Sequence, residues 1–147
     1  MRYVFLENFT VSEDKESLVG ELRVQKTWSI FNDHFPGFPV FPGALIVETM
    51  AQHAVSLMME HKKPLESVIP TLIQVDRAKF TEMVIPDCVL KIEVKKEFMV
   101  YPNFKFMCAA SVDDKSVATA RLTLAFRPMP PGQGLDFMGF YLKGGGA

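Results

Sequence analysis

The chain lacks the features by which several classes of protein are recognised. It has 147 residues and only two cysteines, and Cys88 and Cys108 stand too far apart for the paired spacings of a disulfide framework or a zinc site. The formal net charge is −1, which gives no electrostatic reason to expect nucleic acid or an anionic membrane as a partner. The sequence also has no glycine-rich loop for a phosphate or a dinucleotide. We therefore expect no metal, no cofactor, no nucleic acid and no membrane partner.

Long apolar segments are missing as well. The stretch MRYVFLENF reaches an acid and an amide within eight residues, so it lacks the apolar core of a secretory signal. No run approaches the length that spans a membrane, and we expect a cytoplasmic location. What the chain does contain is 48% hydrophobic residues, with 13 phenylalanines and nine methionines, which predicts a core or cavity built from bulky, adaptable groups.

The length and composition fit one domain with a sizeable core. We place this domain at residues 1–128 and a Pro/Gly-rich extension at residues 129–147. The extension begins as a linker, PMPPGQG, but its later stretch LDFMGFYL is apolar enough that we expect it to dock on the sheet or on a second subunit.

Hydrophobic periodicity predicts one helix and several strands. Residues 18–28 alternate between apolar and polar side chains, which is typical of a half-buried strand, and residues 2–11 form an expected first strand. The nearly continuous apolar run at residues 42–60 is long and rich in Ala, Leu and Met, which favours a buried helix. Four further strands, separated by turn signals, are expected at residues 71–80, 88–98, 103–113 and 116–126. The predicted fold class is α+β, with an antiparallel sheet that curls round the helix.

An acid lies inside this apolar helix. The helical neighbours of Glu48 are Ala44, Leu45, Ala51 and Gln52, none of which is a cation. Such surroundings penalise the charged form of a carboxyl group, and a protonated carboxyl is what a general acid needs. Alternatively, Glu48 lies on a solvent-facing stripe with Gln52 and Ser56.

A histidine and a glycine precede the helix. Pro36, Gly37 and Pro39 restrict or permit unusual backbone torsions after His34, so its imidazole can be aimed reliably and can accept a proton when neutral. The alternative is an ordinary surface or turn histidine. Gly43 follows the Pro42 that opens the helix, and backbone N–H groups there point toward any oxygen that gains negative charge. Pro-Gly is also a common start signal for helices.

The other two histidines are weaker candidates. We expect His53 on the polar side of the helix and His61 at its end.

A base, an acid and an oxyanion donor form a coherent set. Together they can take a proton from the carbon next to a thioester carbonyl and expel a hydroxyl from the following carbon as water. This chemistry requires no metal, flavin or nicotinamide.

The stretch HFPGFPVFPGALIVETMAQ resembles the signature of the FabZ-type 3-hydroxyacyl-acyl carrier protein dehydratases, and the similarity extends over roughly residues 3–126. The resemblance implies a hot-dog fold, in which a long central helix is wrapped by a curved antiparallel sheet. It implies that His34 is the base, that Glu48 protonates the departing hydroxyl, that the Gly43 N–H binds the thioester carbonyl, and that Gln52 orients the carboxyl group or a water.

The same resemblance implies the partners. The substrate arrives on the phosphopantetheine of an acyl carrier protein, and His34 meets Glu48 of a second subunit in a homodimer. Such dimers often assemble into trimers of dimers, and a heterodimer with a related hot-dog subunit is an alternative. The pathway is fatty-acid or polyketide/polyene-type biosynthesis.

Four features depart from the family pattern. Phe41 stands where methionine is usual, Asp87 replaces a usual glycine, the usual leading segment is not seen at the N-terminus, and the tail after Phe126 is extra. Two other functions stay open. One is a hot-dog acyl thioesterase in which Glu48 directs water at the carbonyl and His34 is dispensable. The other is a non-catalytic acyl-binding or structural subunit of a synthase.

Overall fold

A computed structural model describes residues 3–61 and 68–130 of the chain. Its one α-helix in these ranges is α1 (Gly43–His61), preceded by a short 3-10 turn, η1 (Ser29–Asn32). The strands are β1 (Asn8–Val11), β2 (Ser17–Val24), β3 (Val68–Phe80), β4 (Cys88–Val100), β5 (Asn103–Val112) and β6 (Lys115–Pro128).

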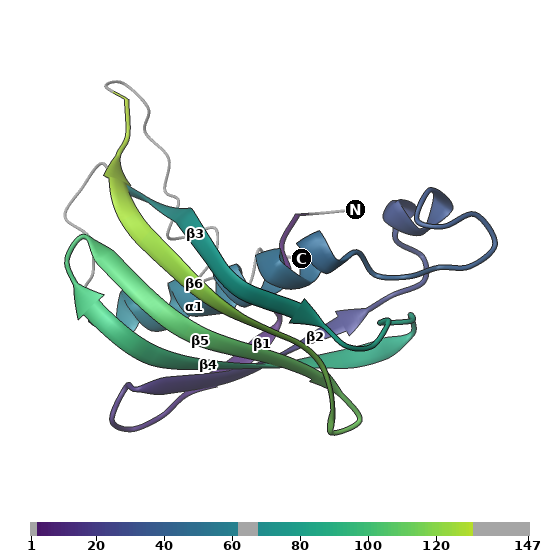
Figure 1. Ribbon diagram of the computed structural model, residues 1–147, viewed down its shortest axis with the longest axis horizontal. Coiled ribbons are helices and arrows are strands. Elements are labelled where there is room, and N and C mark those ends of the chain that lie inside the picture. The colour runs from purple at the N-terminus through teal and green to yellow at the C-terminus, as the bar shows by residue number, and fades with distance from the viewer. Residues whose placement is uncertain (1–2, 62–67, 131–147) are drawn as a thin grey trace.

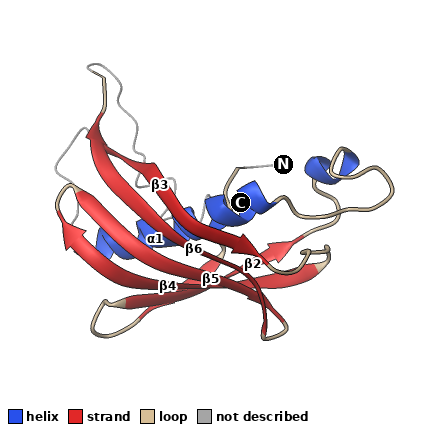
Figure 2. Ribbon diagram, viewed as in Figure 1, coloured by secondary structure: helices blue, strands red, loops and turns tan. Residues whose placement is uncertain are grey.

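The six strands form a single antiparallel sheet in the order β1-β2-β4-β5-β6-β3. The sheet curves round α1, which lies across its concave face and contacts β2 to β6 (Figures 1 and 2). The segment that carries α1 joins β2, near one edge, to β3, which forms the other edge. The predicted α+β class and the wrapped helix are confirmed.

The burial and the two ends of α1 agree with the helix predicted from the apolar run. Every residue of α1 from Met50 to Met59 is buried, as expected for a helix that is apolar on nearly all sides. Pro42 precedes its first turn, where a missing N–H costs nothing, and His61 ends it with a basic side chain beside the negative end of the helix dipole. The helix therefore begins and ends within one residue of the predicted bounds.

The strands that alternate in sequence also alternate in burial. In β2 the side chains of Leu18, Leu22 and Val24 are buried, while Glu21 and Arg23 point to solvent. The same period of two appears in β4 and β5. One face of the sheet therefore packs on α1 and the other face is exposed to solvent, as predicted for an antiparallel sheet.

Two predicted strands are shorter than expected. The first is regular only at Asn8–Val11, because the backbone before it bonds to a helix side chain: the Phe5 N–H donates to Gln52 Oε1 at 2.7 Å. The second ends at Val24 rather than near residue 28. There the Lys26 N–H donates to the Asp87 carboxylate at 2.8 Å and the Trp28 N–H closes a turn onto the Gln25 carbonyl.

The last strand ends at Pro128, where the sequence predicts the domain boundary. Most of the predicted extension, including LDFMGFYL, lies outside the described residues, so its docking stays a prediction.

Candidate active site

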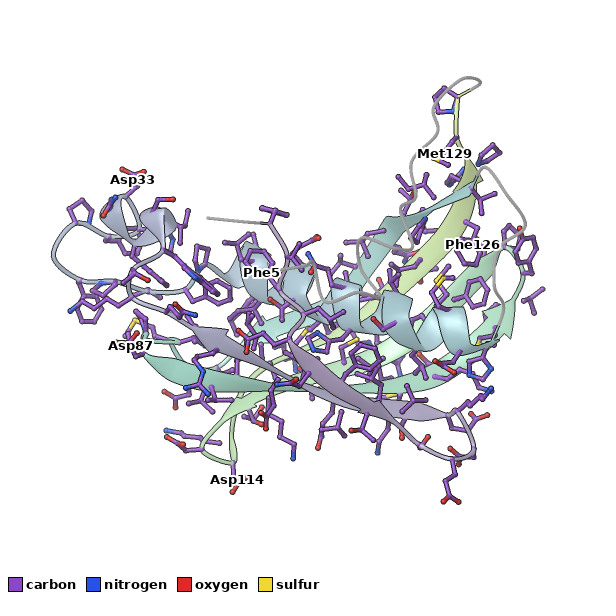
Figure 3. The ribbon with its side chains drawn as sticks, turned by 180° about the vertical axis from the view of Figure 1, so that it is seen from behind. Phe5, Asp33, Asp87, Asp114, Phe126 and Met129 are labelled. Carbon is purple, nitrogen blue, oxygen red and sulfur yellow. The ribbon has the colours of Figure 1, made fainter. Side chains whose placement is uncertain are left out.

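His34 lies in a loop that projects beyond one end of the sheet. Its neighbour Asp33 marks this loop in Figure 3, at the end of the molecule opposite Phe126 and Met129. Backbone hydrogen bonds fix the loop at both sides of the histidine, since the His34 N–H donates to the Ile30 carbonyl and the Val40 N–H donates to the His34 carbonyl, each at 3.0 Å.

The turn after His34 is closed by its own backbone. Phe35 and Phe38 exchange two hydrogen bonds, of 3.0 and 2.9 Å. Between them Gly37 has a φ of +80°, a value that glycine adopts without a steric penalty. The loop is therefore held by main-chain contacts, as the Pro and Gly pattern predicts.

The imidazole of His34 is oriented by two contacts. Nδ1 lies 2.8 Å from the Val40 carbonyl oxygen, and the ring stacks on Phe35 with 4.0 Å between ring centroids. A carbonyl oxygen can only accept, so Nδ1 carries the proton in this bond and Nε2 is left as the acceptor of the neutral ring. The half-buried histidine is thus prepared to receive a proton at Nε2.

Gly43 is the first residue of α1, where backbone N–H groups lie before the regular helical bonds begin. Leu45 and Ile46 both donate to the Pro42 carbonyl, at 2.9 and 3.1 Å. The edge of the Phe80 ring packs on Gly43 so closely that an added Cβ would lie 3.0 Å from its Cε1 atom. A side chain at this position would require the Phe80 ring to shift slightly.

A hollow of about 400 Å³ opens beside Gly43. Its wall is mostly apolar and includes Val40, Ile46, Phe80 and Met83. Phe80 and Met83 are 50% and 64% exposed, so this hollow has an open apolar rim in the single chain.

Glu48 is held by Gln52, one helical turn later. Gln52 Nε2 donates to Glu48 Oε1 at 3.0 Å and to the Tyr3 carbonyl at 3.2 Å, while Gln52 Oε1 accepts from the Phe5 N–H at 2.7 Å. Only 3% of Gln52 is exposed. Its amide is therefore fully engaged, and it fixes one carboxyl oxygen of Glu48 and leaves Oε2 toward other partners.

A second, smaller cavity of about 100 Å³ adjoins this pair. Besides Glu48 and Gln52 it is lined by apolar side chains from α1, β3 and β6, namely Ala51, Val55, Pro70, Leu72 and Leu124. The Glu48 side chain thus lies between its polar partner Gln52 and a cavity with apolar walls. The solvent-stripe alternative is wrong, because Gln52 and Ser56 are buried and Glu48 is half-buried.

Three of the four predicted residues lie on α1, and His34 lies apart from them in the preceding loop. Glu48 and Gln52 are hydrogen-bonded to each other, and Gly43 lies one and a half turns before them on the same helix. No hydrogen bond joins His34 to Glu48 within the chain.

Sequence reasoning missed the residues that line the hollow beside Gly43 and those that hydrogen-bond to Gln52. Phe80 and Met83 come from the end of β3 and the loop after it, far along the chain from Gly43, and no local pattern connects them. The sequence pattern predicts Tyr3 and Phe5 to be strand residues and does not indicate that their backbone groups hydrogen-bond to Gln52. Each contact depends on the topology of the sheet rather than on neighbouring letters.

His53 does not lie on the polar side of the helix, as predicted, but is fully buried between α1 and β2. Its Nδ1 lies 2.8 Å from the Thr49 carbonyl oxygen and its Nε2 has no hydrogen-bond partner. Burial lowers the pKa of His53 to about 4, because the charged ring would lose its hydration. It is neutral at physiological pH and is not part of the candidate site.

Within residues 3–61 and 68–130, no group of three or more His, Cys, Asp or Glu side chains is arranged to hold a metal ion. In the same ranges, no helix is both long enough and apolar enough to cross a membrane. Cys88 and Cys108 are both free thiols.

Sequence comparisons give a consistent family. The model of the ApeI-like family, described as ApeI dehydratase, matches residues 10–121. The 3-hydroxyacyl-(acyl-carrier-protein) dehydratase FabZ of Acidiphilium cryptum is 38% identical over 136 residues, which span 90% of this chain and 82% of that protein. FabZ of Lactobacillus helveticus is 36% identical over 120 residues, or 82% of this chain and 80% of that protein.

Solved structures share the fold. The dehydratase heterocomplex ApeI:P from Xenorhabdus doucetiae superposes with a TM-score of 0.68 at 19% identity, covering 88% of this chain and 85% of that one. A mutant thioesterase from Pseudomonas aeruginosa gives a TM-score of 0.63 at 18% identity, with coverages of 83% and 81%. At these identities the likeness concerns the fold alone, and it confirms the predicted hot-dog architecture.

Proposed function

The chain belongs to the FabZ-type, ApeI-like family of hot-dog dehydratases, and from this premise we propose that it converts (3R)-3-hydroxyacyl-acyl carrier protein into trans-2-enoyl-acyl carrier protein and water. The reaction serves fatty-acid or polyketide/polyene-type biosynthesis. The observation that carries the proposal is the pair of prepared proton-transfer groups, a histidine with a free Nε2 and a carboxyl group held through one oxygen.

In this proposal His34 is the base. Its Nε2 takes the proton from the substrate carbon next to the thioester carbonyl, while the Nδ1–H bond to Val40 stabilises the imidazolium that forms. Electrons of the broken C–H bond move toward the carbonyl, whose oxygen gains negative charge. The Gly43 N–H, at the positive end of α1, donates to that oxygen.

Glu48 is the acid. Gln52 donates to Oε1, so the proton resides on Oε2 and is delivered to the hydroxyl on the next substrate carbon. As the carbon–oxygen bond breaks, water leaves and the carbon–carbon double bond forms. His34 ends protonated and Glu48 ionised, and one proton transfer between them or through solvent resets the site. Gln52 acts as a positioning residue because it contacts the carboxyl group and no reacting atom.

We further infer that the site is completed by a second subunit, so that His34 of one chain meets Glu48 of the other. The missing contact between them within one chain supports this arrangement. So does the exposure of apolar side chains at the same end of the molecule: Phe35, Phe38, Phe80, Met83 and Ile85 are each more than 40% exposed. The proposed assembly is a homodimer, with a trimer of dimers or a heterodimer with a related hot-dog subunit as the variants to distinguish.

The proposed substrate carrier is the phosphopantetheine arm of an acyl carrier protein, the partner in the names of the FabZ relatives. No cofactor takes part in the proposed steps. The expected cytoplasmic location stays a prediction, which cell fractionation checks.

The direct test supplies (3R)-hydroxyacyl thioesters of graded length, on carrier protein and on coenzyme A, and follows both enoyl product and free acid. We expect enoyl product from the wild type, and a loss of about 10²- to 10⁴-fold in kcat for His34→Ala and for Glu48→Gln. His61→Ala, at the far end of α1, is the matched control and retains full activity. Free acid without enoyl product would identify a thioesterase, and no turnover at any length would identify an acyl-binding subunit.

A further inference from the structure

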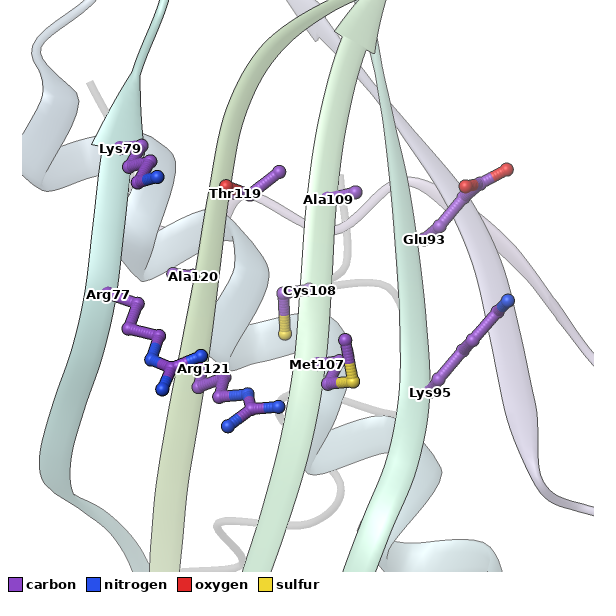
Figure 4. A pocket seen from close by; sticks show the side chains of 10 residues that line it. All are labelled: Arg77, Lys79, Glu93, Lys95, Met107, Cys108, Ala109, Thr119, Ala120 and Arg121. Atoms are coloured by element: carbon purple, nitrogen blue, oxygen red, sulfur yellow. The ribbon is translucent and has the colours of Figure 1, made fainter.

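The outer face of the sheet, away from α1, carries a cleft of about 370 Å³. In Figure 4 the cleft is seen from outside, with α1 behind the sheet. Its floor consists of small side chains, including Ala109 and Thr119, on the neighbouring strands β5 and β6. Long side chains from β3 and β4 stand on either side of this floor. The cleft exists because short residues alternate with long ones across four neighbouring strands.

Four cations surround the cleft: Arg77, Lys79, Lys95 and Arg121. The only acid in its lining is Glu93, which already pairs with Lys91 at 3.3 Å. Arg121 pairs with Glu97 at 3.3 Å, but the side chains of Arg77, Lys79 and Lys95 make no ion pair with any residue of the described ranges. A chain with a net charge of −1 thus concentrates unneutralised positive charge at one hollow.

The backbone at Arg77 places its guanidinium there. Arg77 has a φ of +50°, which is uncommon for a residue with a side chain, and it lies in the irregular stretch of β3 between Asp76 and Lys79. Such a bulge re-aims a side chain. In Figure 4 the Arg77 and Arg121 side chains lie next to each other on the same face. Arg121 already pairs with Glu97, whereas Arg77 has no ion pair within the described residues, so an anion bound beside Arg77 would offset the repulsion between the two guanidinium groups.

We propose that this cleft binds the phosphate group of an organic phosphate. Guanidinium groups match phosphate oxygens with two parallel hydrogen bonds, and Lys79 and Lys95 supply further positive charge. The apolar floor and the Met107 side chain give the organic part of the ligand a surface to contact. The volume falls in the range of small-molecule sites and exceeds what a bare phosphate needs.

The cleft is a binding site rather than a second reactive centre. Its one thiol, Cys108, is 4% exposed, and burial raises the pKa of that thiol to about 12, so no thiolate is available. The cleft also lies on the opposite face of the sheet from Glu48 and Gln52. The proposal does not rest on the proposed dehydratase function and can fail or hold separately.

The test is isothermal titration of the full chain with coenzyme A, with AMP and with inorganic phosphate, at about 0.15 M salt so that long-range attraction is screened. We expect saturable binding of an organic phosphate, with inorganic phosphate as a weaker competitor. Arg77→Gln is expected to weaken binding about tenfold or more, since it removes charge-assisted hydrogen bonds. Lys115→Gln makes the same charge change at an exposed site outside the cleft and is expected to bind as the wild type does.

The two organic probes separate the sources of the phosphate. Binding of both coenzyme A and AMP assigns the nucleotide part that the two share, and binding of coenzyme A alone assigns the parts that AMP lacks, the pantetheine arm and the additional phosphates. The proposal is overturned if neither binds, if inorganic phosphate binds as tightly as they do, or if Arg77→Gln binds as the wild type does. Circular dichroism of Arg77→Gln checks its fold. Arg77→Lys keeps the positive charge but loses the two parallel N–H donors of the guanidinium group, so it is expected to bind with intermediate strength. Turnover of an N-acetylcysteamine thioester, which has no phosphate, is expected to be unchanged in Arg77→Gln.

Discussion

Gln52 links the acid of the proposed mechanism to the N-terminal segment of the chain. Its amide bonds to Glu48 on one side and to the backbone of Tyr3 and Phe5 on the other. A buried glutamine whose amide makes three hydrogen bonds fixes a carboxyl group more firmly than solvent can.

Gln52→Met tests this role, because methionine has a similar shape and none of the hydrogen bonds. We expect kcat to fall by up to about 10²-fold with little change in KM, since the acid is misplaced while the substrate cavity keeps its size. The free energy of unfolding is expected to fall by about 1–3 kcal/mol, because the buried Phe5 N–H loses its acceptor. Steady-state kinetics well below the melting temperature separate the two effects.

Ser56→Ala provides the control for Gln52→Met. It removes one buried hydrogen bond, of 3.2 Å, from the next turn of the same helix without touching Glu48. A loss of kcat as large in Ser56→Ala as in Gln52→Met would reduce Gln52 to a structural residue.

His53 makes the stability of the fold depend on pH. Its pKa is about 4 in the folded chain, against 6.5 when exposed. Well above pH 6.5 neither state binds the proton, so stability is at its full value. As the pH falls toward 4, the unfolded chain takes up a proton that the folded chain rejects, and stability decreases by about 3 kcal/mol in total.

The expected measurement compares urea unfolding at pH 7 and pH 5 in the wild type and in His53→Leu. Between pH 7 and pH 5, His53 is expected to lower the free energy of unfolding of the wild type by about 2 kcal/mol. The loss in His53→Leu should therefore be smaller than the loss in the wild type by about 2 kcal/mol. Equal losses in both proteins would mean that other groups set the acid sensitivity.

At the scale of elements, β2 and α1 are in close contact where Gly20 faces His53. A Cβ on Gly20 would lie 2.3 Å from His53 Cδ2 and 2.4 Å from Nε2, a separation that real side chains do not reach. The glycine therefore allows a ring to lie between helix and strand, and the two residues form one packing unit.

Gly20→Ala is expected to lower the free energy of unfolding by about 1–3 kcal/mol, because the ring must move within a filled core. In Gly20→Ala with His53→Ala the clash is absent, so the double variant should be more stable than the sum of the two single losses predicts. Urea denaturation of the four proteins in this cycle measures the coupling. Additive losses would show that the two residues do not constrain each other.

The elements that periodicity predicts best are those that bury one face or all faces. The helix at α1 and the alternating strand β2 follow directly from the order of apolar residues. The first strand does not, because the apolar residues Val4 to Leu6 fit a strand pattern equally well while their backbone bonds to Gln52 instead. A side chain that satisfies a backbone group from 47 residues away leaves no trace in local sequence.

The same reasoning separates what was predictable in the candidate site. His34, Gly43 and Glu48 come from one continuous stretch, so their spacing and residue types could be recognised from the sequence. The position of Phe80 and Met83 at the rim of the Gly43 hollow depends on where β3 ends. The misjudged His53 reflects a rule that polar residues on a helix face solvent, which fails when every side of the helix is covered.

At the scale of the whole molecule, the single chain presents an incomplete site. His34 is in the loop beyond the sheet and Glu48 is on α1, and no hydrogen bond connects them. In a two-fold dimer, each of two equivalent sites would take its histidine from one subunit and its acid from the other. This arrangement makes a prediction that no single-chain mechanism shares.

The decisive measurement is the dehydratase activity of a dimer that contains one His34→Ala subunit and one Glu48→Gln subunit, isolated by two different affinity tags after co-expression. Each homodimeric variant is expected to be inactive. The mixed dimer contains one site with both wild-type groups, so it should recover about half of the wild-type rate. A mixed dimer as inactive as its parents would contradict a site shared between subunits, and full activity in either parent would contradict the roles of His34 and Glu48 themselves.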